Sequence, residues 1–579
     1  MVLLELSKIV SEAFKQCGYD SSLGVVSTSD RPDLCQFQCN GSFDGAKQYK
    51  KSPVIIAKEV AAILADNKVF ESVEVIPPGF LNLIVTDDYI LEKVNQIASD
   101  EHMGIAQCNE TILLDYGGPN VAKPLHIGHI RAAIIGESLK RIARATGRKV
   151  IGDVHLGDWG LPIGLVIAEL EVRYPHWKCF SVNFNPQTDK IEPLNVNDLS
   201  EIYPFASKKS KEDESFRGRA KDITADLQNG HPGYISLWKE IMRISINDLK
   251  ANYQKLNVEF DLWYGESDAE KYVPDLLQSL KEHGVMYESE GALVVDVSEE
   301  SDKAPMPPII IKKSDNSNMY STTDLATIIQ RQRDYAPDRI WYVVDKRQEL
   351  HFTQVFRCAN KINLTTAKLE HLGFGTMNGS DGKPYKTRDG GVMRLSDFIE
   401  TIIDAADKKM SESDFVSTAD KKAIAQKVAV AAIKFGDLSN HRLRDYIFDI
   451  DKFLAFEGKT GTYLVYTVSR INSILKKLSV KNESICFKHI YTDIEREIFL
   501  NIILTCETFQ NAVNERAPNY ICDNAYKLAA LFSSFYHDNH IGNEQDEHKR
   551  NAWLAICVMV RNMLIKQLDV LGIETVESM

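Results

Sequence analysis

Two histidines three residues apart, His126 and His129, are the side chains whose types and spacing most directly suggest chemistry. They stand in the string His-Ile-Gly-His, where a short apolar run at 111–117 gives way through a turn to a helical pattern. Residues three apart on an opening helical turn share a face. The start of a helix presents free N–H groups and partial positive charge, and Gly128 lets a ligand approach the backbone. These features suit a triphosphate whose α-phosphorus is attacked.

The residues alone leave other interpretations of this string open. Two histidines at this spacing also cap or pack the start of a helix, which requires no ligand. A metal site is indicated less, because the chain contains neither His-Glu-x-x-His nor Cys-x-x-Cys. The strand–turn–helix context, and the motifs that follow it along the chain, favour the phosphate-binding interpretation.

Residues 119–147, which contain the string, resemble the first signature of class I aminoacyl-tRNA synthetases. Their flanks resemble the arginyl-tRNA synthetase family in particular. Further stretches resemble motifs of the same family, in one order along nearly the whole chain. They lie at 155–160, 319–324, 345–348, 382–388, 445–449 and 571–579. Chance explains such an ordered series poorly.

The resemblance implies ATP-dependent ligation of L-arginine to its cognate tRNA for protein synthesis. The arginine carboxylate attacks ATP, which gives arginyl-adenylate and pyrophosphate, and the terminal ribose of the tRNA then takes the arginyl group and releases AMP. The first step needs alignment and cancellation of developing negative charge. In this resemblance His126 and His129 are the catalytic donors to phosphate oxygens.

The second signature of class I enzymes normally carries two lysines in a Lys-Met-Ser-Lys-Ser loop, and this chain has no such string. Residues 382–388 take its place in the resemblance, with Lys383 and Lys386 at the two lysine positions. Lysine near a leaving pyrophosphate acts as a point charge. Lys123, just before the histidine string, is a candidate to share this role, and the division among the three lysines stays open.

The predicted ATP-binding residues are Gly128, Gly157, Asp158 and Trp159. The last three stand where the family closes around ribose and adenine, and a tight turn with a packing tryptophan is the alternative. Magnesium is expected to arrive with ATP, because that ion keeps its waters and binds through phosphates. No protein metal site and no structural zinc are expected.

Selection of arginine demands acids, because a guanidinium offers five donors in a rigid fork and never deprotonates. The resemblance carries five residues over to this role. Tyr320 and Asp324 are four apart, which puts them on one face if the segment is helical, and they are expected to bind the guanidinium. The amino and carboxylate ends are assigned to Asp115, Asn120 and Gln348.

A chain of 579 residues is too long for one core. We expect an α/β protein with three domains. A Rossmann-like catalytic domain at 106–404 has a doubly wound parallel sheet, because strand and helix patterns alternate there. Its strand candidates are 113–116, 149–156, 292–297, 309–313 and 339–344. A connective insertion at about 178–230 reads as polar, with mostly solvated helices.

The two flanking domains are expected to contact tRNA. Residues 1–105 read as a small α+β domain, and in the resemblance Phe37 and Asn40 lie in a loop that touches the tRNA. Residues 405–579 contain no good strand and read as an α-helical bundle, which holds the anticodon in the family. Arg442 and Arg444 are candidate phosphate contacts.

Composition is that of an ordinary globular protein, and the net charge of −13 argues against wholesale coating of nucleic acid. The ten cysteines are scattered, and no signal peptide or membrane span is evident. A cytoplasmic protein is expected, and family grounds suggest a monomer. Two rival functions stay open: another nucleotidyl transferase with the same histidine string, and a non-catalytic relative that binds tRNA or a protein.

Overall fold

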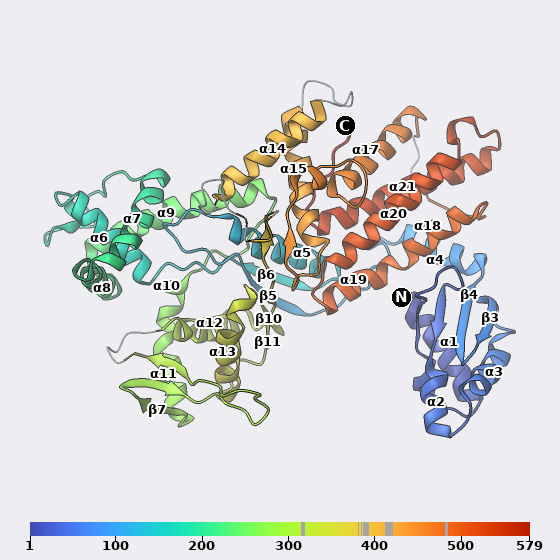
Figure 1. Ribbon diagram of the computed structural model, residues 1–579, viewed down its shortest axis with the longest axis horizontal. Coiled ribbons are helices and arrows are strands. Elements are labelled where there is room, and N and C mark those ends of the chain that lie inside the picture. Colours follow the sequence, from blue (N-terminus) through green and yellow to red (C-terminus); the bar gives the residue numbers. More distant parts are fainter. Residues whose placement is uncertain are drawn as a thin grey trace.

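The computed structural model describes residues 1–313, 319–379, 381–383, 385, 393–411, 421–480 and 485–578. Figure 1 shows a central parallel sheet, a helical bundle that packs beside it, and a separate N-terminal unit at one end of the molecule. Lys386 lies outside the described residues. Among the helices that are described, none combines the length and the apolar character needed to cross a membrane.

The N-terminal unit has the predicted α+β architecture. Its sheet is antiparallel in the order β1-β2-β4-β3 and is packed against helices that follow apolar stripes. The strands are β1 (Val26–Thr28), β2 (Phe37–Cys39), β3 (Phe70–Ile76) and β4 (Phe80–Val85), and the helices are α1 (Val2–Gln16), α2 (Gly41–Tyr49) and α3 (Pro53–Leu64). The next helix, α4 (Asp87–Ser99), leads into the catalytic domain and meets the bundle, where Arg496 Nε lies 2.8 Å from Asp87 Oδ1.

The catalytic sheet has four described strands, all parallel, in the order β11-β10-β5-β6. They are β5 (Thr111–Tyr116), β6 (Lys149–Asp153), β10 (Arg339–Val343) and β11 (Lys368–His371). Three of them were predicted. The strand β11 was not, because this edge strand is half-buried and reads as Lys-Leu-Glu-His, with no apolar run.

Two of the predicted strands belong to a different sheet. The segments 292–297 and 309–313 contain β8 (Ala292–Val295) and β9 (Ile309–Lys312), which pair antiparallel with each other. With β7 (Met286–Ser289) they form a small three-stranded sheet outside the parallel one. The prediction was wrong on this point, since a short apolar run does not reveal which sheet a strand joins.

The insertion is more packed than predicted. Its helices each bury one apolar face, with Leu199, Ile202, Phe216 and Ile223 all at most 6% exposed. They assemble with the flanking helices into a helical lobe at the left of Figure 1. The helices are α6 (Leu161–Arg173), α7 (Val196–Glu212), α8 (Glu214–Gln228) and α9 (Pro232–Lys255).

The C-terminal region is the predicted helical bundle, with one short exception. Strand β13 (Tyr446–Ile447) pairs in parallel with β12 (Met377–Asn378) and so joins this region to the catalytic domain. The principal helices are α14 (Leu395–Ser411), α15 (Lys421–Leu438), α17 (Gly461–Lys477), α18 (Asp493–Ile503), α19 (Thr505–Asn514), α20 (Asn519–Asp538) and α21 (Glu547–Val570).

Candidate active site

Three predicted motifs meet at the carboxyl edge of the parallel sheet. Strands β10, β5 and β6 are neighbours, and each runs directly into one motif, at 345–348, 117–120 and 155–159. Open parallel sheets bind their ligands outside this edge. The strand order therefore brings together segments that are more than 200 residues apart in the chain.

The histidine string forms the 3-10 turn Ile127–His129, directly before helix α5 (Ile130–Ala145). The amide N–H of Gly128 donates to Nδ1 of His126 at 3.1 Å, and the amide N–H of His126 donates to Nδ1 of His129 at 3.1 Å. An amide N–H can only donate, so both Nδ1 atoms are acceptors in these contacts. The Nδ1 atom of His129 also lies 3.2 Å from the carbonyl oxygen of His126, to which only the other tautomer could donate. The two amide contacts favour the tautomer of a neutral imidazole that carries its proton on Nε2.

The surroundings keep both histidines neutral. Burial, followed by the charge of Lys123, lowers the pKa of His126. Burial is also the main cause that lowers the pKa of His129 to about 3, and His126 and Lys123 add to it. Each ring therefore offers one uncharged N–H donor at neutral pH.

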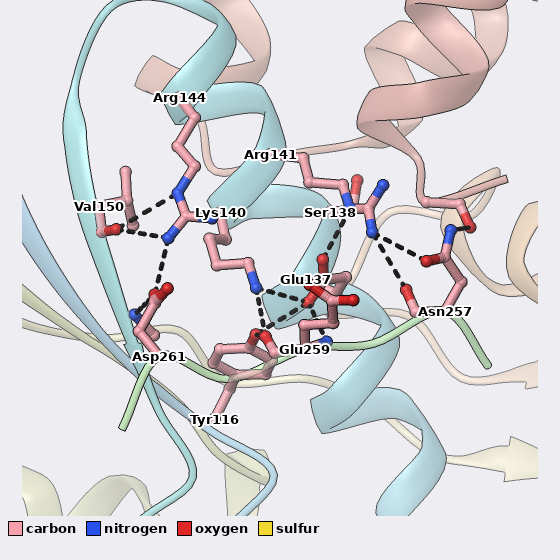
Figure 2. Close-up of polar contacts among 12 residues, drawn as sticks. Tyr116, Glu137, Ser138, Lys140, Arg141, Arg144, Val150, Asn257, Glu259 and Asp261 are labelled. Carbon is pink, nitrogen blue, oxygen red and sulfur yellow. Dashed lines mark hydrogen bonds and ion pairs between the residues drawn. The ribbon is translucent and has the colours of Figure 1, made fainter. Parts of the chain in front are cut away.

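Helix α5 is held against the sheet by a buried charged network, drawn in Figure 2. Glu137 is 1% exposed and accepts hydrogen bonds from the Tyr116 hydroxyl at 2.9 Å and from Arg141 Nε at 2.6 Å. Lys140 Nζ lies 2.9 Å from Glu137 and also donates to the carbonyl of Glu259. Because Tyr116 ends β5, the network fixes the helix that follows the histidines to the strand that carries Asp115.

The segment with the second-signature lysines ends beside the histidines. It leaves from β12 and returns at Met393, whose carbonyl accepts from the Ile127 N–H at 3.1 Å. The Leu395 N–H then donates to the Leu125 carbonyl at 2.9 Å. Lys383 is exposed, and Lys123 is half-buried and close enough to His126 to lower its pKa.

Asp115 and Asn120 lie at this edge, with different environments. Asp115 is 7% exposed, and its Oδ2 lies 2.6 Å from Nη2 of Arg331 on helix α12 (Tyr320–Tyr335). The same Nη2 lies 2.8 Å from Asp153 at the end of β6. Asn120 is exposed and packs on Gly157, where a Cβ atom would stand 2.1 Å from the Asn120 Oδ1. Gly157 is thus required by close approach of the two motifs.

Asp115 and Asp153 also belong to a possible metal-ligand group with His155, whose ligand atoms all lie within 4.8 Å of one another. The guanidinium of Arg331 occupies the position between the two carboxylates. The positive charge in this cluster is therefore supplied by the chain itself.

Tyr320 is the first and Asp324 the fifth residue of helix α12, so their spacing does place them on one helical face. Tyr320 is 67% exposed, and Asp324 is half-buried with its Oδ2 2.6 Å from Nε2 of His351 on helix α13 (Glu349–Lys361). Gln348 is exposed in the 3-10 turn Lys346–Gln348.

Glu266, at the start of helix α10 (Glu266–Ala269), was missed by the sequence reasoning. Burial raises its pKa to about 7, and the carboxylates of Asp324 and Asp158 add to the rise. Clustered, partly buried acids are a charge-selective environment for a cation. A signal exists in the sequence, an acid after Gly265 at a helix start, but only the fold places it beside Asp324.

The remaining nucleotide candidates are divided between surface and interior. The Asp158 carboxylate is buried and accepts from the Ser267 hydroxyl at 2.6 Å and the Ser267 N–H at 3.0 Å, so it faces α10. Trp159 packs edge-on against Trp238, with ring centroids 5.2 Å apart. The role of Asp158 and Trp159 in ATP binding stays a prediction. Gly128, another predicted ATP-binding residue, is exposed beside the histidines.

One of the predicted tRNA contacts needs correction. Phe37 is 0% exposed in the core of the N-terminal sheet, so its predicted place in a contact loop is wrong. Arg442 is half-buried and donates to the carbonyls of Gly373 at 2.7 Å and Arg516 at 3.2 Å, and its predicted contact with tRNA stays a prediction. Asn40 and Arg444 are exposed.

Comparison with known proteins identifies the class. Residues 93–450 match the family model described as tRNA synthetases class I (R), catalytic domain. Residues 464–579 match the DALR anticodon binding domain, and residues 4–85 match the arginyl tRNA synthetase N terminal domain. The sheet, the histidine turn and the bundle are thus those of a class I aminoacyl-tRNA synthetase.

Full-length relatives narrow the class to one family. The chain is 47% identical to an arginine–tRNA ligase of Alkaliphilus oremlandii, covering 100% of both chains, and 46% identical to that of Agathobacter rectalis, covering 99% of both. The fold matches that of Plasmodium falciparum arginyl-tRNA synthetase with a TM-score of 0.84 at 23% identity, covering 100% of this chain and 99% of the other. The chain belongs to the arginyl-tRNA synthetase family. It is an aminoacyl-tRNA ligase, and its function is to charge tRNA with arginine.

Proposed function

We propose that His126 and His129 promote the activation step as neutral hydrogen-bond donors. The arginine carboxylate attacks the α-phosphorus of ATP, pyrophosphate leaves, and both Nε2–H groups donate to α-phosphate oxygens as negative charge develops. The observation that carries this proposal is the pair of backbone N–H groups that engage both Nδ1 atoms. The terminal ribose hydroxyl of tRNA then takes the arginyl group from the adenylate.

Lys123, Lys383 and Lys386 are proposed to balance the charge of the leaving pyrophosphate. For Lys383 this role is supported by the segment that holds it, because that segment returns to the catalytic domain beside the histidines. Mg²⁺ is proposed to enter with ATP, held by phosphates and water. Gly128 supports the triphosphate because its exposed backbone permits close approach.

The arginine side chain is proposed to lie between Asp324 and Glu266, with Tyr320 at the mouth of the site. Two carboxylates match the two edges of a guanidinium fork. The amino and carboxylate groups of the arginine substrate are then proposed to be bound by Asp115, Asn120 and Gln348. Asn40 and Arg444 are proposed to contact tRNA, and the chain is proposed to act as a cytoplasmic monomer with domains at 1–105, 106–404 and 405–579.

The proposed arginine site is tested by exchange of pyrophosphate into ATP, with tRNA present, supported by arginine, lysine or citrulline. Lysine lacks the planar fork, and citrulline leaves both acids without a cation, so exchange with either should fall by about 10²-fold or more. If citrulline supports exchange as well as arginine does, the two acids do not bind the guanidinium.

A further inference from the structure

Residues 442–448 run alongside residues 373–378 and tie the bundle to the catalytic domain. The Gly375 N–H donates to the Arg442 carbonyl at 2.9 Å, and the Tyr446 N–H donates to the Thr376 carbonyl at 3.1 Å. The Phe448 N–H donates to the Asn378 carbonyl at 2.9 Å. Directly after this pairing the chain enters the segment that carries Lys383.

Arg131 reaches this junction from the histidine turn. It is the second residue of α5, two residues after His129, and is 2% exposed. Its Nε donates to Asp437 Oδ2 on α15 at 2.9 Å, and its Nη1 donates to the Arg444 carbonyl at 3.1 Å. One guanidinium thus holds the end of α15 and the backbone just before β13.

Tyr446 completes the link. Its hydroxyl donates to the same Asp437 Oδ2 at 3.0 Å, and its ring lies under the Arg131 guanidinium at 5.1 Å. Tyr446 is also the residue of β13 that stands opposite Met377 of β12. The three side chains therefore connect the first turn of α5 to the strand pair from which the Lys383 segment departs.

Stability alone does not explain the contact of Arg131 with Asp437. Over the described part of the chain, Arg131 Nη2 and Asp437 Oδ1 are buried without a hydrogen-bond partner. Burying an ion pair costs desolvation, and apolar replacements of such pairs are often neutral or stabilising. The ion pair of Arg131 and Asp437 does fix the geometry between α5 and α15.

A neighbouring side chain extends the junction to the arginine-binding segment. Asp445 Oδ1 accepts from Lys346 Nζ at 3.1 Å and from the Thr376 N–H at 2.7 Å. Lys346 starts the turn that holds Gln348. Asp445 therefore contacts the turn that holds Gln348, while Tyr446 contacts Asp437 and Arg131.

We propose that Arg131 is a positioning residue for arginine activation. Through Asp437 and Tyr446, it sets the place of His126 and His129 relative to the strand that leads to Lys383. The proposal rests on the roles proposed above for the histidines and Lys383. A shift of about 1 Å between reacting groups can lower a rate by about 10²-fold, so loss of the link should act on kcat.

The variants that test it are Arg131→Lys, Asp437→Asn and Tyr446→Phe. The matched control is Glu495→Gln. Like Asp437, Glu495 is a buried carboxylate that accepts a hydrogen bond from an aromatic side chain, here from Trp553 Nε1 at 2.8 Å, but it lies within the bundle. For each variant, kcat and KM of tRNA-dependent exchange are measured with the melting temperature. The proposal predicts about 10- to 100-fold lower kcat for Arg131→Lys and Asp437→Asn, with KM for ATP and arginine within about 2-fold. Tyr446→Phe keeps the ring and should lose less.

Glu495→Gln should lower the melting temperature and leave kcat unchanged. If the junction variants behave as this control does, the link is structural and the proposal is overturned. A second measurement combines Arg131→Lys with Lys383→Met. Positioning predicts that the double variant loses less than the product of the single losses, whereas independent effects would multiply and contradict it. If Lys383→Met alone has no effect, the proposed role of Lys383 fails, and the kcat values of the junction variants still decide the role of Arg131.

Discussion

The imidazole rings of His126 and His129 lie with their centroids 3.9 Å apart and their planes inclined at 36°. Two cationic rings at this separation would repel, so the arrangement favours the neutral forms that burial also favours. Each ring is oriented by a backbone N–H rather than by a mobile side chain. The pair therefore presents two fixed donors, and in the proposed mechanism the lysines and magnesium balance the remaining negative charge of the phosphates.

The pH dependence should show no role for imidazolium. The exchange rate is measured between about pH 5.5 and 8 with saturating arginine and ATP, for the wild type and for His129→Gln. Because the pKa of His129 is lowered to about 3, we expect the two pH profiles to have the same shape. A wild-type inflection that disappears in His129→Gln would contradict this. Both histidines titrate near 6.5 when unfolded and lower when folded, so their contribution to stability is present above about pH 6.5 and is lost as pH falls through the lowered pKa values, about 3 for His129. The melting temperature of His129→Gln should therefore fall less steeply over that window.

Arginine binding should release protons near neutral pH. The pKa of Glu266 is about 7 in the free protein, and a bound guanidinium lowers it because it stabilises the carboxylate. At pH 7 about half a proton per site should be released, which calorimetry in two buffers of different ionisation enthalpy measures. Glu266→Gln should abolish the release and weaken arginine binding. Unchanged proton release in that variant would place Glu266 outside the site.

Asp324→Asn should act mainly through arginine affinity. Removing one charged partner of a bidentate pair leaves the guanidinium partly unsatisfied, which costs about 2–4 kcal/mol and raises the KM for arginine by about 30- to 1,000-fold. The KM for ATP serves as the internal control and should change little. An unaltered KM for arginine would remove Asp324 from the guanidinium site and leave its contact with His351 as its role.

Two helical glycines should respond to alanine in opposite ways. At Gly136 in α5, a Cβ would stand 2.3 Å from the Tyr116 ring, so Gly136→Ala should cost about 1–3 kcal/mol of stability. At Gly218 in α8, a Cβ would meet nothing within 4 Å, and Gly218→Ala should stabilise by about 0.4–1 kcal/mol. Melting temperatures of both variants test this, and a neutral Gly136→Ala would show that α5 can move away from β5.

The sequence predicted those parts of the site that depend on local order. The histidine turn follows a strand and starts a helix, because a strand–turn–helix pattern is a local signal. Tyr320 and Asp324 lie on successive turns of α12, where a spacing of four residues puts them on one face. Placement by the fold was harder to predict. Phe37 reads as a loop residue, yet its alternation with Cys39 points both side chains into the N-terminal core.

Residues whose partners are distant in the chain could not be assigned from the sequence. Glu266 comes within electrostatic range of Asp324 only because the segment after Leu262 pairs with the end of β6, at Asp153 and Leu156. Arg131 and Asp437 are 306 positions apart, and the sequence does not show that Arg442 donates to the carbonyls of Gly373 and Arg516. Periodicity and spacing carry no information about such contacts.

The most direct test of the neutral-donor account compares His129→Gln with His129→Asn in arginine-dependent pyrophosphate exchange with tRNA present. The glutamine amide can place an N–H near the position of Nε2, whereas the asparagine amide reaches only to the position of Nδ1. The account predicts that His129→Asn lowers kcat by about 10²–10³-fold with little change in ATP affinity, and that His129→Gln retains a measurable part of the lost rate. Equal activities of both variants and the wild type, or a loss confined to ATP binding, would contradict it.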